Sequence, residues 1–389
     1  MKKKILFICS NMNIGGFQIS LINLLKNLDY NSYNVDLFLL DKKGLFMQEI
    51  PKEVNLVELN NFEKDFFDGT VDSIKSLYHK RKYLLSLARF FVGIIQMIDK
   101  GYGAIAMSKF IPTIADEYDC CIDYNGQYLN YYMIDKVKAK KKITYFHSDY
   151  AKWDYYKHAD KIYYNKADAI VTVSDICVES MKKYFPEYAD KIYCIENIIS
   201  KNTVLPKAYV KHILLDKKKI ILMTVGRVCF DKGYDLAFEA AKLLKNEFDN
   251  FVWYWVGPGS EDKEIQNKLK EYKLENEFKF LGPSADPYYY LEQADIAVYP
   301  SRFEGKSVVI EETKVINKPI VVTNFSTVNN QVQNRKSGLI VDMDGNAIYS
   351  AIKELIENKE LYNSIIDFQK NNFIGNEEEI NKLYKLINK

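Results

Sequence analysis

The feature that most constrains the fold is a regular alternation of short apolar runs with amphipathic segments along the 389-residue chain. The short runs have the length of buried strands, and the segments between them repeat with helical periodicity. Strands that alternate with helices in this way form parallel sheets, because each crossover helix covers a face of the sheet. The sequence therefore predicts an α/β protein.

The alternation occurs in two series, separated by a stretch at Asn197–Lys218 that lacks periodicity and contains Pro206. A chain of this length also exceeds what one hydrophobic core normally serves. We predict two doubly wound, Rossmann-like domains that face each other across a cleft, at residues 1–198 and 199–370. We expect residues 371–389 to form a C-terminal helix that crosses back to the first domain.

The expected strands of the first series are Ile5–Cys9, Val35–Leu40, Cys120–Tyr124, Ile143–Phe146, Ala169–Val173 and Ile192–Ile195, and its longest expected helix is Ile74–Ile98. The expected strands of the second series are Ile220–Val225, Phe251–Val256, Lys279–Leu281, Ile296–Tyr299, Ile320–Thr323 and Leu339–Val341. Its expected helices include Tyr288–Gln293, Ser307–Asn317 and Gly345–Glu357.

Composition excludes several classes of function. Lys+Arg of 54 against Asp+Glu of 52 gives a nearly neutral chain, which argues against nucleic-acid binding. The six cysteines and four histidines show no zinc-ligand spacing, so we expect free thiols. The most apolar segment, Phe90–Ile98, is far shorter than the ~20 residues of a membrane-spanning helix.

Two glutamates lie at an expected junction between a strand and a helix. Glu304 follows the strand Ile296–Tyr299, and Glu312 lies in the helix after it. Loops at the carboxyl ends of parallel strands line the ligand crevice of open α/β sheets. A helix N-terminus there favours phosphate, whereas carboxylates suit sugar hydroxyls. The combination indicates a ligand with an anionic centre and polyhydroxy ends, such as a sugar nucleotide.

A cationic motif follows the first strand of the second series. Arg227 and Lys232 flank the expected start of a helix after Gly233, and a guanidinium with an ammonium suits a pyrophosphate. For an isolated pair, surface residues near Asp231 would be the better interpretation. We favour phosphate binding because Glu304 and Glu312 lie in the same half of the chain.

Three further places are candidates for ligand contact. Gly15 and Gly16 follow the first strand, where they either bind an anion through backbone N–H groups or form a tight turn. This loop is not the G-x-G-x-x-G fingerprint of dinucleotide-binding proteins. Gly259 lies in a strand-end turn that can face a nucleotide. His147 ends a buried strand, as a polar ligand to a reacting group or as a structural histidine.

Two charged stretches have ordinary interpretations. Asp342 and Asp344 resemble a metal clamp, but turn formation and capping of the next helix explain both carboxylates, so we predict no metal site. The five lysines within 136–142 are typical of a solvated face. Together with Phe90–Ile98 they could instead form a surface that rests on an anionic membrane.

These residues resemble the GT-B fold glycosyltransferases of the large retaining family 4, over most of the chain and most strongly from Val225 to Gly338. The family's pair of glutamates separated by seven residues is similar to Glu304 and Glu312. Its V-G-R…K-G motif is similar to Val225-Gly226-Arg227 with Lys232-Gly233, and its glycine-rich first loop to Gly15-Gly16. The segment after His147 resembles bacterial members that build surface polysaccharides.

The resemblance implies a role for each candidate residue. Arg227 and Lys232 would hold the diphosphate of the donor, helped by Gly15, Gly16 and the helix start at Ser307. Gly259 and Gly305 are further candidates for contact with the donor. Glu304 would contact the transferred sugar, Glu312 the ribose, and His147 the C6 side of the sugar. The resemblance implies no divalent metal. The chain departs from the family at Lys306, where members commonly have an aromatic residue, so this lysine adds a cation near the phosphates.

We therefore predict a retaining transferase that uses a nucleoside-diphosphate sugar, a UDP-hexose or UDP-N-acetylhexosamine. The expected acceptor is a glycan or lipid-linked glycan, at the inner face of the membrane, with peripheral contact to anionic lipid. In this interpretation 1–198 is the acceptor-side domain and 199–370 binds the donor. Two alternatives remain open: an epimerase that acts on sugar nucleotides, and a non-catalytic GT-B subunit that binds an acceptor protein.

Overall fold

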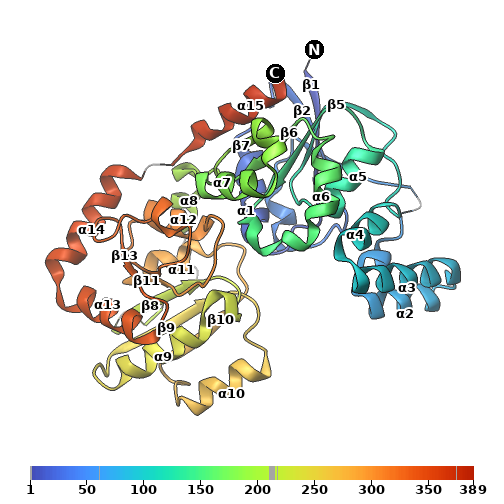
Figure 1. Ribbon diagram of the computed structural model, residues 1–389. Coiled ribbons are helices and arrows are strands. Elements are labelled where there is room, and N and C mark those ends of the chain that lie inside the picture. The colour runs from blue at the N-terminus through green and yellow to red at the C-terminus, as the bar shows by residue number, and fades with distance from the viewer. Residues whose placement is uncertain (1, 61, 210–214, 217, 374) are drawn as a thin grey trace. The chain divides into compact units, whose positions relative to one another are not determined.

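The computed structural model describes residues 2–60, 62–209, 215–216, 218–373 and 375–389. Contacts divide the chain into two compact units, each an α/β structure built on a parallel sheet (Figure 1). The first unit comprises Met1–Asn13, Leu24–Glu196 and Glu379–Lys389, and the second comprises Ile14–Asn23 and Asn197–Glu378. These units differ from the boundary that we predicted after residue 198, because Ile14–Asn23 group with the second unit. The C-terminal segment Glu379–Lys389 groups with the first unit.

The sheet of the first unit has the order β3-β2-β1-β4-β5-β6-β7, and all of the described pairings are parallel. Strand β1, an interior strand of this sheet, is fully buried from Ile5 to Cys9, as expected for a strand covered by helices on both faces. The strands are β1 (Lys3–Cys9), β2 (Tyr33–Leu39), β3 (Val54–Val57), β4 (Glu117–Asp123), β5 (Lys138–Phe146), β6 (Ala169–Thr172) and β7 (Ile192–Cys194).

The helices that accompany this sheet differ from the prediction, because one predicted helix is broken and the helices at Lys100–Ser108 and Tyr128–Lys136 were not predicted. The helix predicted at Ile74–Ile98 is two helices, because Arg81 between them adopts a left-handed backbone with φ of 59°. The described helices are α2 (Thr70–His79), α3 (Tyr83–Ile98), α4 (Lys100–Ser108), α5 (Tyr128–Lys136), α6 (Lys157–Tyr164), α7 (Asp175–Tyr184) and α15 (Ile380–Asn388). Helix α1 (Gly16–Lys26) contributes Gly16–Asn23 to the second unit.

The sheet of the second unit has the order β10-β9-β8-β11-β12-β13, again with parallel pairings throughout the described residues. Five of its strands begin and end where the sequence predicts, because each is a continuous apolar run. The strands are β8 (Ile220–Val225), β9 (Phe251–Val256), β10 (Phe278–Gly282), β11 (Ile296–Tyr299), β12 (Ile320–Thr323) and β13 (Leu339–Val341).

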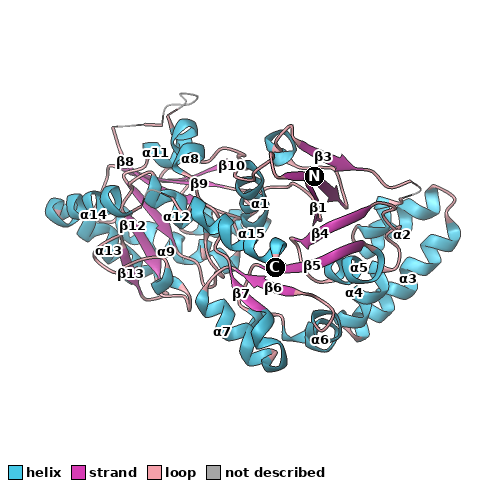
Figure 2. Ribbon diagram, turned by 90° about the horizontal axis from the view of Figure 1, so that it is seen from above, coloured by secondary structure: helices cyan, strands magenta, loops and turns pink. Residues whose placement is uncertain are grey.

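Helices cover both faces of this second sheet (Figure 2). They are α8 (Lys201–Ala208), α9 (Tyr234–Lys245), α10 (Lys263–Glu271), α11 (Tyr288–Gln293), α12 (Val308–Val315), α13 (Gly345–Glu357) and α14 (Lys359–Asn372). Helix α8 lies in the segment that we expected to be a connector. Among the described residues, no helix combines the length and the apolar character that a membrane span requires.

Two tryptophans of β9 fix the carboxyl end of β8 in the second unit. Trp253 and Trp255 are fully buried in the core. Their indole N–H groups need acceptors when buried. Nε1 of Trp253 donates to Oγ1 of Thr224 at 2.9 Å, and Nε1 of Trp255 donates to the Gly226 carbonyl at 2.8 Å. The core therefore holds the backbone from which the predicted cationic loop begins.

Candidate functional site

The loops after β8 and β9 lie against each other with almost no room for side chains. Gly226 has φ of 155°, and a Cβ added at Gly257 would lie 1.9 Å from the Gly226 carbonyl oxygen. The Val228 N–H donates to the Pro258 carbonyl at 2.8 Å, and a Cβ on Gly259 would lie 2.5 Å from the Val228 carbonyl oxygen. Close backbone packing therefore explains Gly257 and Gly259 without a ligand.

Arg227 projects from this packed loop as an exposed side chain. Among the described residues, no carboxylate lies within ion-pair distance of its guanidinium. A guanidinium has five N–H donors and no acceptor, so an exposed one beside ordered backbone can bind an anion without first losing a protein partner.

Lys232 and Glu304, both predicted as site residues, form an ion pair in the second unit. Lys232 ends a short 3-10 helix after β8, and Glu304 lies in the loop between β11 and α12. Their side chains are 23% and 13% exposed, so both charges are partly desolvated. The same oxygen of Glu304, Oε1, also accepts a hydrogen bond from Oγ of Ser301 at 2.9 Å. This pair joins the carboxyl ends of neighbouring strands β8 and β11.

Gly233 brings these two strand ends together. It has φ of 71°, and a Cβ there would lie 1.9 Å from the carbonyl oxygen of Pro300. No other residue fits, because both the left-handed backbone and the close approach require the absence of a side chain. The glycine that the sequence places before α9 therefore positions Lys232 opposite Glu304.

Arg302 is a residue of this region that the sequence analysis missed. Its Nη1 and Nη2 donate to the two carboxylate oxygens of Asp235 at 2.8 and 2.7 Å, and its guanidinium carbon lies 3.8 Å from the centre of the Phe230 ring. The Arg302 backbone N–H also donates to the Asp231 carbonyl at 2.8 Å. This bidentate pair holds the two loops together, whereas Arg227 has its donors exposed.

The start of α12 is held by Gln331, a residue that no sequence motif indicated. Its Oε1 accepts from the Ser307 backbone N–H at 2.8 Å, and its Nε2 donates to the Ser307 carbonyl at 2.8 Å. The N–H of Ser307, predicted to help bind phosphate, therefore already has a protein partner. Gly305 is buried and Lys306 partly exposed in the preceding loop. Thr327 donates to the Glu304 carbonyl at 2.9 Å.

Glu312 lies in a different environment from Glu304. It is 2% exposed, and its Oε1 accepts a hydrogen bond from the Tyr288 hydroxyl at 2.6 Å. Burial raises the pKa of Glu312 to about 8, although the Tyr288 hydrogen bond acts in the opposite direction. The partner of Glu312 is thus a tyrosine at the start of α11, a residue that sequence reasoning also missed.

His147 follows β5 in the first unit. Its Nε2 lies 3.2 Å from the Tyr124 carbonyl oxygen, and its ring stacks against Tyr145 at a centroid distance of 5.5 Å. A carbonyl oxygen only accepts, so Nε2 carries a proton and donates it. The neighbouring Asp149 caps the next helical turn and accepts from Ser180.

The turn that holds His147 depends on Asp123. The carboxylate of this buried residue accepts from the backbone N–H groups of Asn125 and Gly126 at 3.0 Å, and from Oγ1 of Thr144 at 2.8 Å. Burial raises the pKa of Asp123 to about 7. Asp123 therefore fixes the backbone on both sides of the Tyr124 carbonyl.

Gly15 and Gly16 lie in the loop after β1 and at the start of α1. A Cβ on Gly15 would lie 2.4 Å from Oε1 of Gln18, whereas nothing lies within 4 Å of a Cβ on Gly16. Neither has a positive φ. Packing within the chain therefore gives no reason for a glycine at position 16, which is exposed.

The lysine run 136–142 spans the end of α5 and the first half of β5. Lys136 donates to the carbonyls of Lys109 and Ile111, both at 2.6 Å. Lys140 pairs with Asp119 at 2.7 Å, and Lys142 donates to the Ile134 carbonyl at 2.8 Å. Most of these ammonium groups therefore serve local contacts along the sheet.

No group of three or more His, Cys, Asp or Glu side chains within the described part of the chain is arranged to hold a metal ion. Asp344 accepts from the backbone N–H groups of Asn346 and Ala347 at 2.9 Å and so caps α13. Capping, as the sequence predicts, accounts for this carboxylate.

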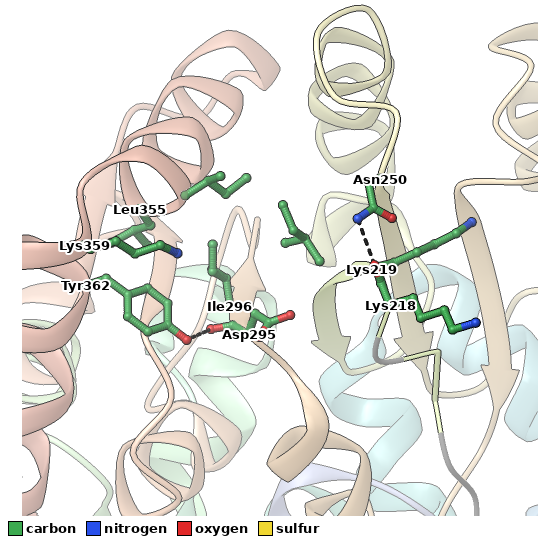
Figure 3. Close-up of a pocket in the computed structure, with 10 residues that line it drawn as sticks. Lys218, Lys219, Asn250, Asp295, Ile296, Leu355, Lys359 and Tyr362 are labelled. Atoms are coloured by element: carbon green, nitrogen blue, oxygen red, sulfur yellow. Dashed lines mark hydrogen bonds between the residues drawn. The ribbon is translucent and has the colours of Figure 1, made fainter.

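A pocket of about 280 Å³ lies at the amino-terminal ends of β8 and β11 in the second sheet (Figure 3). It is lined by Ile220 and Ile296, which begin β8 and β11, together with Lys218, Lys359 and Tyr362. Arg227, Lys232 and Glu304 follow the other ends of these strands, so this pocket is separate from the candidate site.

Comparison with known proteins agrees with these observations. Residues 207–372 match the family of glycosyl transferases group 1. Over 175 residues the chain is 29% identical to an uncharacterized glycosyltransferase of Haemophilus influenzae, a match that covers 44% of this chain and 48% of that protein. Over 200 residues it is 26% identical to the N-acetylgalactosamine-N,N'-diacetylbacillosaminyl-diphospho-undecaprenol 4-alpha-N-acetylgalactosaminyltransferase of Campylobacter jejuni, with coverage of 51% and 53%.

The chain thus spans about half the length of the curated relatives that it matches. Among solved structures, Anabaena HepE in complex with UDP-glucose superposes with a TM-score of 0.69 and 15% identity, over 98% of this chain and 100% of that one. The predicted fold is confirmed, and the predicted enzyme class agrees with the matched family. The chain has the GT-B fold, and its residues 207–372 match the group 1 glycosyl transferases.

Proposed function

We propose that this chain transfers a sugar from a nucleoside-diphosphate sugar, a UDP-hexose or UDP-N-acetylhexosamine, to a glycan or lipid-linked glycan. The observation that most supports this proposal is the partly buried Lys232–Glu304 pair beside the exposed Arg227, all at the carboxyl ends of the second sheet. Such a set offers two cations to a diphosphate and one carboxylate to sugar hydroxyls.

In the proposed reaction Arg227 and Lys232 stabilise the diphosphate as it leaves. The bond between the sugar C1 and the phosphate oxygen breaks, and the departing diphosphate takes the negative charge. Lys232 already faces Glu304, so donor binding exchanges part of this contact for phosphate. Glu304 then accepts hydrogen bonds from the transferred sugar, and Lys306 adds a third cation nearby.

We assign the remaining contacts as follows. Glu312 binds the ribose hydroxyls, Gly15 and Gly16 admit the phosphates, and His147 contacts the C6 side of the sugar. The open space around a Cβ at Gly16 favours close approach of a ligand. For Gly259 and Ser307 the support is weaker, because close packing and Gln331 already explain them.

The proposed reaction retains the configuration at C1. The acceptor hydroxyl attacks from the face that the diphosphate leaves, and its proton passes to an oxygen of the departing phosphate. This route needs no carboxylate nucleophile. We also propose that the fixed cations Arg227 and Lys232 replace a divalent metal in neutralising the diphosphate.

The proposed acceptor follows from the relatives. The similar Campylobacter jejuni protein is named for a diphospho-undecaprenol substrate, and HepE was solved with UDP-glucose. We propose that this chain likewise uses a UDP-sugar and a lipid-linked glycan, in the cytoplasm at the inner face of the membrane.

A transfer assay with a panel of UDP-sugars and undecaprenyl-diphosphate glycans tests the proposal. We expect transfer with retained configuration that persists in EDTA. Loss of a charge-assisted contact in Glu304→Ala should lower kcat/KM by roughly 30- to 1000-fold, about 2–4 kcal/mol. Conversion of the UDP-sugar to an isomer without transfer would favour an epimerase. In a system reconstituted with partner proteins, transfer that is unchanged in Glu304→Ala and Arg227→Ala would favour a non-catalytic subunit.

A further inference from the structure

Helix α3 exposes a nonpolar face that water does not favour. Leu84, Met97 and Ile98 are 85%, 89% and 82% exposed. The other exposed apolar side chains of α3 lie between Leu84 and Ile98 or next to them. Their spacing follows the helical repeat, so they lie on the same side of the helix. The α3 face consists of Tyr83, Leu84, Leu87, Phe90, Phe91, Ile94, Ile95, Met97 and Ile98. A contiguous apolar surface of this kind marks an interaction site.

The orientation of α3 is inverted relative to an ordinary surface helix. Its one charged residue, Arg89, is 3% exposed and donates to the Asp68 carbonyl at 3.2 Å and to Oγ1 of Thr70 at 3.0 Å. Ser86 donates to the Ile74 carbonyl at 3.1 Å. Polar side chains therefore help to fasten α3 to the preceding segment, with Val92 buried in the core, and the side chains of the α3 face are exposed.

The helix hairpin lies at the periphery of the first unit, where α2 and α3 run beside each other next to α4 (Figures 1 and 2). The apolar surface continues onto α2 through Val71 and Tyr78, which are both 61% exposed. The Tyr78 ring lies 5.2 Å from the Tyr83 ring, so the two helices share one surface.

Basic residues border this surface. Arg81 and Lys82 directly precede α3, Lys100 follows it, and Lys75 lies one turn before Tyr78 on α2; all four are exposed. Among the described residues, no carboxylate pairs with Lys75, Arg81 or Lys100, whereas Lys82 pairs with Glu63. Acidic residues are fewer at the border: Asp72 lies beside Val71, and Asp99 caps α4.

We propose that the α3 face docks on an anionic lipid leaflet, with the apolar side chains in the interface and the basic border on the headgroups. Helices of this composition lie in the plane of a bilayer. They gain affinity from the burial of apolar side chains and from the attraction of basic residues to anionic headgroups. The long stems of lysine and arginine let their charges reach the headgroups while the helix lies deeper. The α3 face is a different surface from the lysine run 136–142, whose ammonium groups mostly make local contacts.

The charge pattern favours a leaflet over a second copy of the chain. If two α3 faces packed antiparallel, Arg81 of one copy would approach Lys100 of the other. If they packed parallel, the Arg81 side chains of the two copies would approach each other, whereas Lys80 and Lys82 are already paired with carboxylates. Both arrangements bring like charges together, whereas anionic lipid neutralises all of them. The proposal rests on the proposed function in one respect: a lipid-linked acceptor gives a transferase reason to dock on the leaflet.

Vesicle co-sedimentation of the full chain tests the docking. The chain should bind vesicles made of an equal mixture of phosphatidylcholine and phosphatidylglycerol. It should bind vesicles of pure phosphatidylcholine less. Leu84→Glu/Ile98→Glu, at two highly exposed positions, should lower the partition at least about tenfold. The control Ile162→Glu/Met343→Glu makes the same charge change at exposed apolar positions elsewhere, and should bind as the wild type does. Lys75→Gln and Lys100→Gln should each lower binding to the anionic vesicles about fivefold.

Equal sedimentation of wild type and Leu84→Glu/Ile98→Glu, or no binding by the wild type, would overturn the proposal. So would a wild-type dimer that this variant converts to monomers, since a second copy would then cover the face. UDP binding by the same preparations separates the two proposals. Wild type that binds UDP but no vesicle refutes docking alone, and wild type that binds vesicles but no nucleotide sugar refutes the proposed function alone.

Discussion

Glu304 and Glu312 belong to one sequence motif but have opposite surroundings. Glu304 faces the ammonium of Lys232 and is partly exposed, so its charge has a partner. Glu312 is buried against the Tyr288 hydroxyl, and burial raises its pKa to about 8. At neutral pH the Glu312 carboxyl group is therefore mostly protonated in the absence of a ligand. The sequence predicted both positions, but their different surroundings depend on partners distant in the chain.

Glu312 should make stability depend on pH. Its folded pKa of about 8 exceeds its ordinary value of 4.5, so the folded state holds a proton that the unfolded state has lost between these values. The free energy of unfolding should therefore fall as pH rises from about 4.5 to 8. Glu312→Gln should remove this fall and be more stable than wild type at pH 8, by on the order of a few kcal/mol. Urea unfolding across this pH range measures the effect.

The control for this experiment is Glu360→Gln at an exposed position of α14, which should follow the pH dependence of the wild type. Parallel profiles for Glu312→Gln and wild type would show that Glu312 does not titrate in this window.

The Lys232–Glu304 pair allows stability and activity to be separated. Lys232→Met leaves a partly buried carboxylate without its cation, which should cost about 1–3 kcal/mol of unfolding free energy and most of the transfer activity. The double variant Lys232→Met/Glu304→Gln removes the unpaired charge as well, so it should regain stability but no activity. Recovery of transfer in the double variant would contradict a catalytic role for this pair.

At the scale of elements, buried parallel strands are the most predictable part of this protein. β8, β9, β11, β12 and β13 begin and end at the predicted residues, because strands covered on both faces are continuous apolar runs. The helices α4 and α5 and the strand β3 were missed, since their apolar residues follow less regular spacing. The break at Arg81 was missed because the helical pattern continues across it.

The loops between elements were predicted in position but not in their contacts. Arg302, Gln331 and Tyr288 hold the candidate site together, and each binds a residue far away in the sequence. Periodicity and local motifs report on neighbours in the chain, so such pairings cannot be read from one sequence. The glycines were predictable as turns, but their close approach to another backbone was not.

Two glycines with a left-handed backbone, Gly233 before α9 and Gly282 at the end of β10, distinguish backbone strain from close packing. Gly233 and Gly282 have φ of 71° and 74°, but a Cβ on Gly233 would lie 1.9 Å from the Pro300 carbonyl oxygen, whereas nothing lies within 4 Å of a Cβ on Gly282. Gly282→Ala should lower the free energy of unfolding by about 1 kcal/mol, because alanine is strained in the left-handed backbone conformation. Gly233→Ala should cost at least about 2 kcal/mol more, because the β8 and β11 loops must move apart. Denaturant unfolding of both variants measures this, and equal losses would contradict the packing described.

At the scale of the whole molecule, two series of alternating strands and helices suffice to predict two Rossmann-like units. The assignment of Ile14–Asn23 to the second unit could not be predicted, because it depends on long-range packing. The α3 face was visible in the sequence as an apolar segment. Its exposure was not, because a buried helix would have the same composition.

The central claim is that the second unit binds a nucleoside diphosphate through Arg227. Calorimetric titration of the full chain with UDP tests it most directly. We predict saturable binding, weakened in Arg227→Ala by roughly 10- to 100-fold because a charge-assisted contact contributes about 1.5–3 kcal/mol. Arg335→Ala, which removes an exposed arginine paired with Glu354, should bind UDP as the wild type does. Absence of binding to any nucleoside diphosphate, or equal affinity in wild type and Arg227→Ala, would contradict the claim.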